Sequence, residues 1–204
     1  LDHLIAACDI PQATGFSVPG QTLPHPRDFI NSRDIQPGEI LYIDDIRISC
    51  CENTHYRPED QFGKQGPISL SYRFDAPDRS MVFTGDTGPC LALEEFAKNA
   101  DLLVGELFDT ELVINRLRAT NPDMSDHALL QMRQHFDEHH LTPEDLGQLA
   151  SRAGVKKVVA VHIPFITKSA EEDAKYVSRI LAKFSGSVTI CLLYTSPSPR
   201  DIGE

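Results

Sequence analysis

The pattern of apolar and polar positions changes character near the middle of the chain. The earlier part carries short β-favouring runs separated by turn residues, which is typical of antiparallel strands joined in a meander. These runs are Ile40–Ile43, Ile46–Cys50, Ser69–Phe74 and Met81–Phe83. After Phe83, helical spacing of apolar residues alternates with further short β runs. The sequence therefore predicts a layered αβ domain in which an antiparallel part precedes alternating helices and strands.

One helix of the later part has clear boundaries. Thr142 is a typical N-cap residue, and Pro143 follows it at the first helical position. Asp145 stands near the acidic position of a capping box, and Gly154 is placed to close the helix. We therefore predict a helix between Thr142 and Gly154. Its predicted buried face consists of Leu146, Leu149, Ala150 and Ala153.

Other segments fit the same alternation. The predicted elements are a helix with Leu93, Phe96, Ala97 and Ala100 on one face, a strand at Leu102–Val104, two helices between Glu111 and His139 divided at Asn121-Pro122, a strand at Val158–Val161 and a helix from Ser169. The last helix is predicted to bury Val177, Ile180, Leu181 and Phe184. By contrast, the Pro- and Gly-punctuated segment Asp9–Arg33 predicts a long loop.

Composition excludes several classes of protein. The chain has 204 residues, 41% of them hydrophobic, which fits one globular domain. No run approaches the roughly 20 apolar residues of a membrane span. With 19 scattered basic against 30 acidic residues, the net charge of −11 argues against nucleic-acid binding. The five cysteines are odd in number and form no Cys-x-x-Cys pair, so we expect them to be mostly reduced.

Both ends of the chain have an unnatural character. The run Leu4–Ala7 resembles the tail of a helix already under way, so we expect the sequence to continue upstream. The segment Cys191–Asp201 can be reverse-translated into a transposase-type sequencing adapter read in frame. We therefore expect residues 191–204 to be a non-native tail, and the alternative is a natural Ser/Pro-rich tail.

Polar residues follow the predicted strands at the points where the strands end. Asp86, Glu106 and His162 come after three different strands, and His55 follows a fourth. Ligands bind outside the carboxyl ends of strands in open α/β sheets, so these segments are expected to converge. Two histidines and an aspartate suit Zn²⁺, or Fe or Mn where more carboxylate is present. The alternatives are that Asp86 caps the next helix and that His162 is a buried core histidine.

The remaining histidines are weaker candidates. His135 and His139 are separated by four residues on a predicted helix, but the His-Glu-x-x-His order of a metalloprotease is absent. His127 and His25 lie in polar or Pro-rich surroundings and are expected to be solvated. His140 differs, because its place before the capped helix at Thr142 can direct it toward the strand ends.

The order of these motifs resembles the metallo-β-lactamase superfamily, in its ribonuclease Z and arylsulfatase-like branch. The motifs are Asn53-Thr-His-Tyr56, Phe83-Thr-Gly-Asp-Thr-Gly88, Ala100-Asp-Leu-Leu-Val-Gly-Glu106, His139-His-Leu-Thr142 and Val158-Val-Ala-Val-His162. The resemblance implies an α/β (α+β) fold, the αβ/βα sandwich, with a two-metal site on its edge. Residues 1–190 would then be the C-terminal portion of such a domain.

The resemblance also implies roles for individual residues. His55 would bind the first metal ion, Asp86 would bridge both ions and His162 would bind the second. Glu106 and His140 would form a carboxylate–histidine pair that assists proton transfer. The implied cofactor is two zinc ions, with Fe or Mn as alternatives, holding a hydroxide that attacks a phosphoester, sulfate ester or similar small substrate.

The chain departs from the ribonuclease Z pattern in two places. Gly105 and Leu107-Phe108 replace residues of a His-Glu-Ala-Thr motif, and Leu141 replaces the serine of a His-Ser-Thr motif. These changes weigh against ribonuclease activity.

The family's His-x-His-x-Asp-His signature is absent, which we attribute to truncation. We therefore expect a metal-dependent hydrolase as the parent protein, and a fragment that is inactive by itself and that associates, for example as a homodimer. The alternative is a non-catalytic αβ interaction module.

Overall fold

The computed structural model describes residues 33–56, 67–164 and 170–191. The chain divides into two compact units, Leu1–Gln36 and Pro37–Glu204, and all of the elements below belong to the second unit. In chain order they are β1 (Ile40–Ile43), β2 (Ile46–Glu52), β3 (Leu70–Asp75), β4 (Ser80–Phe83), α2 (Leu91–Phe96), β5 (Leu102–Glu106), α3 (Thr110–Thr120), α4 (Asp126–His139), α5 (Pro143–Ala153), β6 (Lys157–Val161), α6 (Ala170–Leu181) and β7 (Ser187–Ile190). No described helix is long and apolar enough to cross a membrane.

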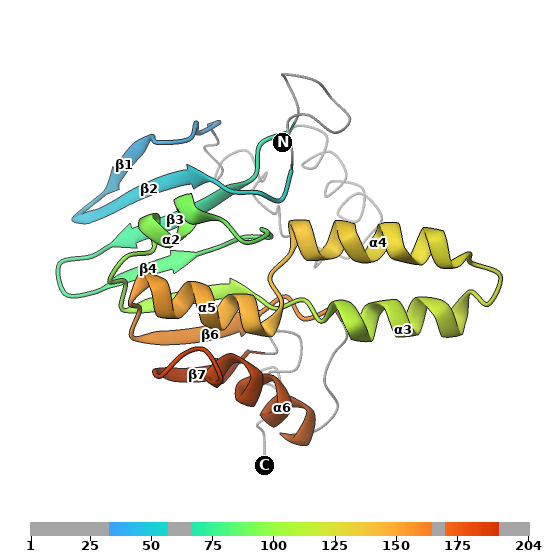
Figure 1. Ribbon diagram of the computed structural model, residues 1–204. Helices are drawn as coiled ribbons and strands as arrows, with labels where there is room; N and C mark the ends of the chain where they lie inside the picture. Colours follow the sequence, from blue (N-terminus) through green and yellow to red (C-terminus); the bar gives the residue numbers. More distant parts are fainter. Residues whose placement is uncertain (1–32, 57–66, 165–169, 192–204) are drawn as a thin grey trace, which may run out of the picture. The chain divides into compact units, whose positions relative to one another are not determined.

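The strands form one seven-stranded sheet whose spatial order is the same as the chain order (Figure 1). Neighbours from β1 to β4 pair antiparallel. From β4 to β7 the pairing is parallel, and helices connect the strands. This confirms the predicted change from an antiparallel meander to alternating helices and strands. It also determines which strand ends lie at the same edge of the sheet.

The core lies between one face of the sheet and the helices α2, α5 and α6, which Figure 1 shows over the same face. Val82, Leu103 and Val158 come from adjacent strands and are almost completely buried there. Burial of each such side chain contributes about 1.5–3 kcal/mol relative to exposure. The predicted face of the segment around α2 is confirmed as well, because Leu93, Ala97 and Ala100 are buried and Phe96 packs against them.

The helix α5 has the boundaries that its sequence predicts. The Thr142 hydroxyl accepts a hydrogen bond from the Asp145 backbone N–H (3.2 Å), and the Asp145 carboxylate accepts one from the Thr142 N–H (3.3 Å). Gly154 ends the helix in the left-handed conformation. The predicted buried face is confirmed for Leu146, Leu149, Ala150 and Ala153. The capping residues therefore determine where α5 begins, shortly after His140.

The last helix differs from its prediction at one position. Ile180 and Phe184 are buried as predicted and Val177 is half-buried, but Leu181 is 43% exposed. Tyr176 is buried in its place, since residues 176, 180 and 184 are each four apart and share one face of the chain. The predicted start at Ser169 and most of the predicted loop Asp9–Arg33 lie outside the described residues.

The cysteines within the described residues form no disulfide bond, as predicted. They are Cys50, Cys51, Cys90 and Cys191. Burial, together with the neighbouring thiols of Cys90 and Cys50, raises the pKa of Cys51 to about 12. A thiol with that pKa remains protonated at neutral pH, so Cys51 acts as an apolar residue of the core.

Helices α3 and α4 form an antiparallel hairpin that runs past the end of the sheet (Figure 1). The side chain of Asp109 caps the start of α3, and the side chain of Ser125 caps the start of α4. The hairpin is inserted between Glu106 and His140 in the chain, so both residues lie at its base. Two helices were predicted in this segment, and they are confirmed.

A single arginine joins three helices near this base. Arg179 on α6 donates two parallel hydrogen bonds to Glu144 on α5 (2.7 and 2.8 Å) and a third to Asp109 (2.9 Å). We expect Arg179→Met to lower the free energy of unfolding by about 1–2 kcal/mol, because bidentate charged bonds are lost while the side chain remains long. Urea denaturation measures this loss. The matched control Arg152→Met removes a more exposed arginine that has a single carboxylate partner, Glu94, among the described ion pairs, and an equal loss in both variants would contradict the prediction.

Candidate metal centre

The carboxyl ends of four strands meet at one edge of the sheet. Strands β4, β5 and β6 are parallel neighbours, so their C-terminal ends lie together. Strand β2 is antiparallel to β3, which is antiparallel to β4, so β2 ends at the same edge. The segments that follow these strands carry His55, Asp86, Glu106 and His162. The topology therefore produces the convergence that was expected from the strand ends.

Potential metal ligands from three separate segments of the chain gather closely. One ligand atom each of His55, Asp86 and His140 lies within 4.8 Å of the others. The Nε2 atom of His162 lies 3.7 Å from Asp86 Oδ2. Two ligands of one tetrahedral zinc ion stand about 3–4 Å apart, given bonds of about 2.0–2.2 Å. The donor set of imidazole nitrogens and one carboxylate thus fits a divalent cation after small side-chain rotations.

Two alternatives for these residues are wrong. The N-cap of the following helix α2 is Cys90, and no side chain caps it, so Asp86 is not the capping residue. The His162 side chain is 62% exposed, so it is not a buried core histidine. Its backbone has a positive φ of 52°, which is uncommon outside glycine. Both side chains are therefore available at the edge of the sheet.

Glu106 and His140 form the predicted carboxylate–histidine pair. His140 Nδ1 lies 2.8 Å from Glu106 Oε2, and the Thr87 N–H donates to Glu106 Oε1 (2.5 Å). Burial raises the pKa of Glu106, while the bonds from His140 and Thr87 oppose that rise. When Glu106 is ionised its carboxylate can only accept, and the His140 Nδ1 then carries the proton of this hydrogen bond. The other ring nitrogen, Nε2, is then available for proton transfer or for binding a cation.

His55 is oriented by a backbone group of another segment. Its Nδ1 lies 3.2 Å from the carbonyl oxygen of His139, which can only accept a hydrogen bond. Histidine ligands usually donate their second nitrogen to such a carbonyl, and this leaves Nε2 for a metal ion. The His55 N–H donates to Asn53 Oδ1 (3.2 Å), and Asn53 donates to the carbonyl of Thr84 (3.0 Å). The buried Asn53 therefore connects the β2 and β4 ends.

His135 and His139 do not join the cluster. Among the described residues, the group of three ligands does not include them. The buried ring of His139 instead lies with Nδ1 3.1 Å from the Thr54 carbonyl, and the ring of His135 packs against it at 4.5 Å between centroids. His127 is exposed, as predicted, and His25 lies outside the described residues. The i, i+4 pair thus supports the loop that carries His55.

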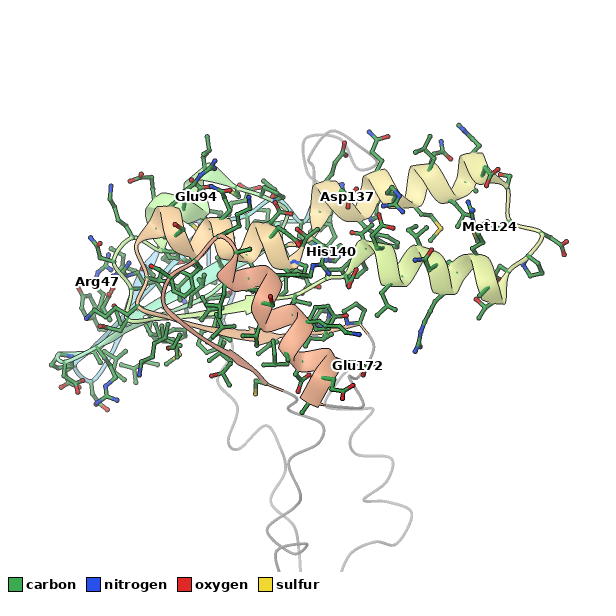
Figure 2. All side chains as sticks on the ribbon, turned by 60° about the horizontal axis from the view of Figure 1, so that its bottom comes forward. Arg47, Glu94, Met124, Asp137, His140 and Glu172 are labelled. Atoms are coloured by element: carbon green, nitrogen blue, oxygen red, sulfur yellow. The ribbon has the colours of Figure 1, made fainter. Side chains whose placement is uncertain are left out.

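The residues that support the site were not predicted from the sequence. Asn53 and Thr87 were not predicted to be site residues, although both belong to motifs that contain predicted site residues. The His139 carbonyl could not be found from side-chain chemistry at all. Figure 2 shows His140 at the base of the hairpin whose tip carries Met124, beside the end of the sheet.

A cavity of about 340 Å³ opens beside the cluster. His55 and Asp86 line one part of it, and Tyr56, Leu70 and Tyr72 line another. Among the residues that the structure describes, no lysine or arginine lines this cavity.

Comparison with known proteins identifies the class. A family model described as the beta-lactamase superfamily domain matches residues 12–163, which is more than half of the chain. The chain therefore belongs to this family.

Solved structures share the fold, which confirms the predicted fold class. A metallo-beta-lactamase fold protein, YhfI from Bacillus subtilis, is 18% identical with a TM-score of 0.53, covering 77% of this chain and 51% of its own. Zn²⁺-bound PqqB from Methylobacterium extorquens is 14% identical with a TM-score of 0.54, covering 82% and 55%.

Among curated proteins, the chain is similar to enzymes named ribonuclease Z. That of Mycobacterium avium (strain 104) is 29% identical over 123 residues, which cover 60% of this chain and 39% of the relative. That of Ignicoccus hospitalis is 30% identical over 112 residues, which cover 55% and 31%. The chain thus spans about a third to two fifths of the length of these relatives.

Proposed function

We propose that the whole protein containing this chain is a metal-dependent hydrolase of the metallo-β-lactamase superfamily that acts on a phosphoester, sulfate ester or similar small substrate. The observation that carries the proposal is the gathering of His55, Asp86 and His140 within 4.8 Å, with His162 3.7 Å from Asp86. These residues come from separate segments of the chain. Family membership supports the same conclusion.

In this proposal the residues have distinct roles. His55 would hold a first metal ion, His162 would hold a second, and the Asp86 carboxylate would serve both. Zinc suits this donor set, and Fe or Mn are alternatives. Bound ions would supply Lewis acidity to the ester oxygen and activate water for attack. Further ligands would come from the rest of the whole protein, so we propose that this chain alone is inactive.

Residues of this chain would donate the proton that the leaving group needs. Glu106 accepts a hydrogen bond from His140 Nδ1 and so keeps the proton on that nitrogen. In the protonated ring, Nε2 can donate to the leaving group, which is the role of a general acid. The burial of Glu106 strengthens this hydrogen bond by excluding water.

A ribonuclease is the second candidate function, because the curated relatives named above are ribonucleases Z. The net charge of −11 and the lack of basic residues among the described lining of the cavity weigh against a phosphate backbone as the substrate. We therefore favour a small ester.

Metal content and hydrolysis test the proposal directly. We expect the purified whole protein to contain about two Zn, Fe or Mn ions per chain by mass spectrometry. It should hydrolyse bis(p-nitrophenyl) phosphate or p-nitrophenyl sulfate, lose that activity with a chelator and regain it with zinc. Cleavage of RNA without cleavage of the small esters would favour the second candidate. Absence of metal and of both activities would identify a non-catalytic module.

A further inference from the structure

The ring of His140 is stacked against a phenylalanine. The ring centroids of Phe108 and His140 are 4.4 Å apart, and the ring planes differ by only 18°. Phe136 packs on Phe108 with a centroid distance of 4.9 Å, on the base of the hairpin. Phe108 immediately precedes the capped start of α3, and Phe136 lies in the last turn of α4. Both aromatic residues therefore belong to the insertion between Glu106 and His140.

Backbone hydrogen bonds fix the stacked rings from two sides. The Phe108 N–H donates to the Leu141 carbonyl (2.8 Å), which joins the segment after β5 to the segment after α4. The His140 N–H donates to the Phe136 carbonyl (2.9 Å). Leu141 is fully buried, so this connection is shielded from water. The position of the Phe108 ring relative to His140 is thus determined by the backbone rather than by side-chain packing alone.

The hydrogen bond and the stack constrain different motions of the imidazole. The Glu106 bond fixes where Nδ1 points, but it permits the ring to tilt about the line from Nδ1 to the carboxylate. A parallel aromatic ring at 4.4 Å opposes that tilt, because tilting breaks the stacking contact. Both constraints together hold the imidazole in one orientation beside His55 and Asp86. Displacement of a catalytic group by about 1 Å can cost about a hundredfold in rate.

We infer that Phe108, supported by Phe136, is a positioning residue that fixes the ring plane of His140 for proton transfer. The inference rests on the proposed function. It is particular to this chain, because the motif that the segment Gly105–Phe108 resembles has threonine at the fourth position. Phe108 acts through His140 and is not itself assigned a contact with the substrate.

Replacement of Phe108 tests the inference in the metal-loaded whole protein. We expect Phe108→Leu to lower kcat about tenfold while KM changes less than twofold, because ring order rather than substrate binding is lost. Phe108→Tyr keeps the aromatic face and should restore kcat. The matched control is Phe74→Leu, the same change at a half-buried phenylalanine on β3 that packs against Phe83. Equal kcat in Phe108→Leu and Phe74→Leu would overturn the inference.

A spectroscopic measurement separates positioning from general stability. In the nuclear magnetic resonance spectrum, the ring signals of His140 are identified by their absence in His140→Gln. The rings of His55 and His140 lie 5.0 Å apart between centroids, so we expect nuclear Overhauser contacts between their ring protons. These contacts should weaken in Phe108→Leu, because the ring of His140 can then tilt, and they should return in Phe108→Tyr. Unchanged contacts in Phe108→Leu would contradict the inference. If the wild-type protein binds no metal and hydrolyses no ester, the proposed function fails, while these contacts still decide the role of Phe108.

Discussion

Replacement of Asp86 by asparagine is expected to reduce both metal affinity and kcat/KM of the whole protein by more than about 100-fold. Loss of a residue that only supports a ligand already costs about 10–100-fold in metal affinity, and Asp86 is the carboxylate of the ligand group itself. Asparagine has nearly the same shape but no charge, so the loop should keep its conformation. Metal content after dialysis and hydrolysis of p-nitrophenyl esters measure the two losses.

An aspartate at the opposite end of the sheet provides the matched control. Asp101 directly precedes β5 and accepts hydrogen bonds from the Ser80 N–H (2.7 Å) and Lys156 Nζ (2.5 Å). These contacts hold the pKa of Asp101 at about 2. Asp101→Asn makes the same chemical change away from the ligand cluster, so metal content and kcat/KM should remain within twofold of the wild type. Retention of two metal ions in Asp86→Asn would show that Asp86 is not a metal ligand.

The sequence could predict what depends on local chemistry and strand direction. The start of α5 follows from Thr142 and Asp145, which bond to each other three residues apart. The convergence of Asp86, Glu106 and His162 follows from parallel strands, whose carboxyl ends share an edge. Neither inference requires knowledge of how distant segments pack. Such features are encoded within a few residues or by topology alone.

The parts that could not be predicted depend on contacts between distant segments. The bond that orients His55 comes from a carbonyl 84 residues away, and every residue has such a carbonyl. Whether Tyr176 or Leu181 is buried depends on the angle at which α6 packs, and both residues satisfy a helical apolar pattern. The stacking of Phe108 on His140 likewise needs the hairpin geometry. A sequence pattern identifies the side chains of a site but not the distant groups that orient them.

The two glycines beside Asp86 act in two different ways. Gly85 has a positive φ of 62°, which glycine adopts without steric cost and which permits a tight turn. Gly88 has no such conformation, yet a Cβ atom there would overlap with the backbone carbonyl of Glu138 in the last turn of α4. The Asp86 loop therefore packs directly against the helix end that carries His139 and His140. This close approach holds the two halves of the ligand cluster together.

Gly88→Ala is accordingly expected to lower the free energy of unfolding by about 3 kcal/mol, at the upper end of overpacking effects, because backbone rather than a flexible side chain blocks the new methyl group. Urea denaturation measures this loss. Gly38→Ala is the control, since its φ of 82° adds strain but no atom lies within 4 Å of the new Cβ. We expect about 1 kcal/mol there. The same displacement should shift the His139 carbonyl that orients His55 and so lower the metal content of Gly88→Ala, whereas Gly38→Ala should bind metal normally. Equal stability losses with full metal content in both variants would mean that the approach of Gly88 to Glu138 does not hold the cluster together.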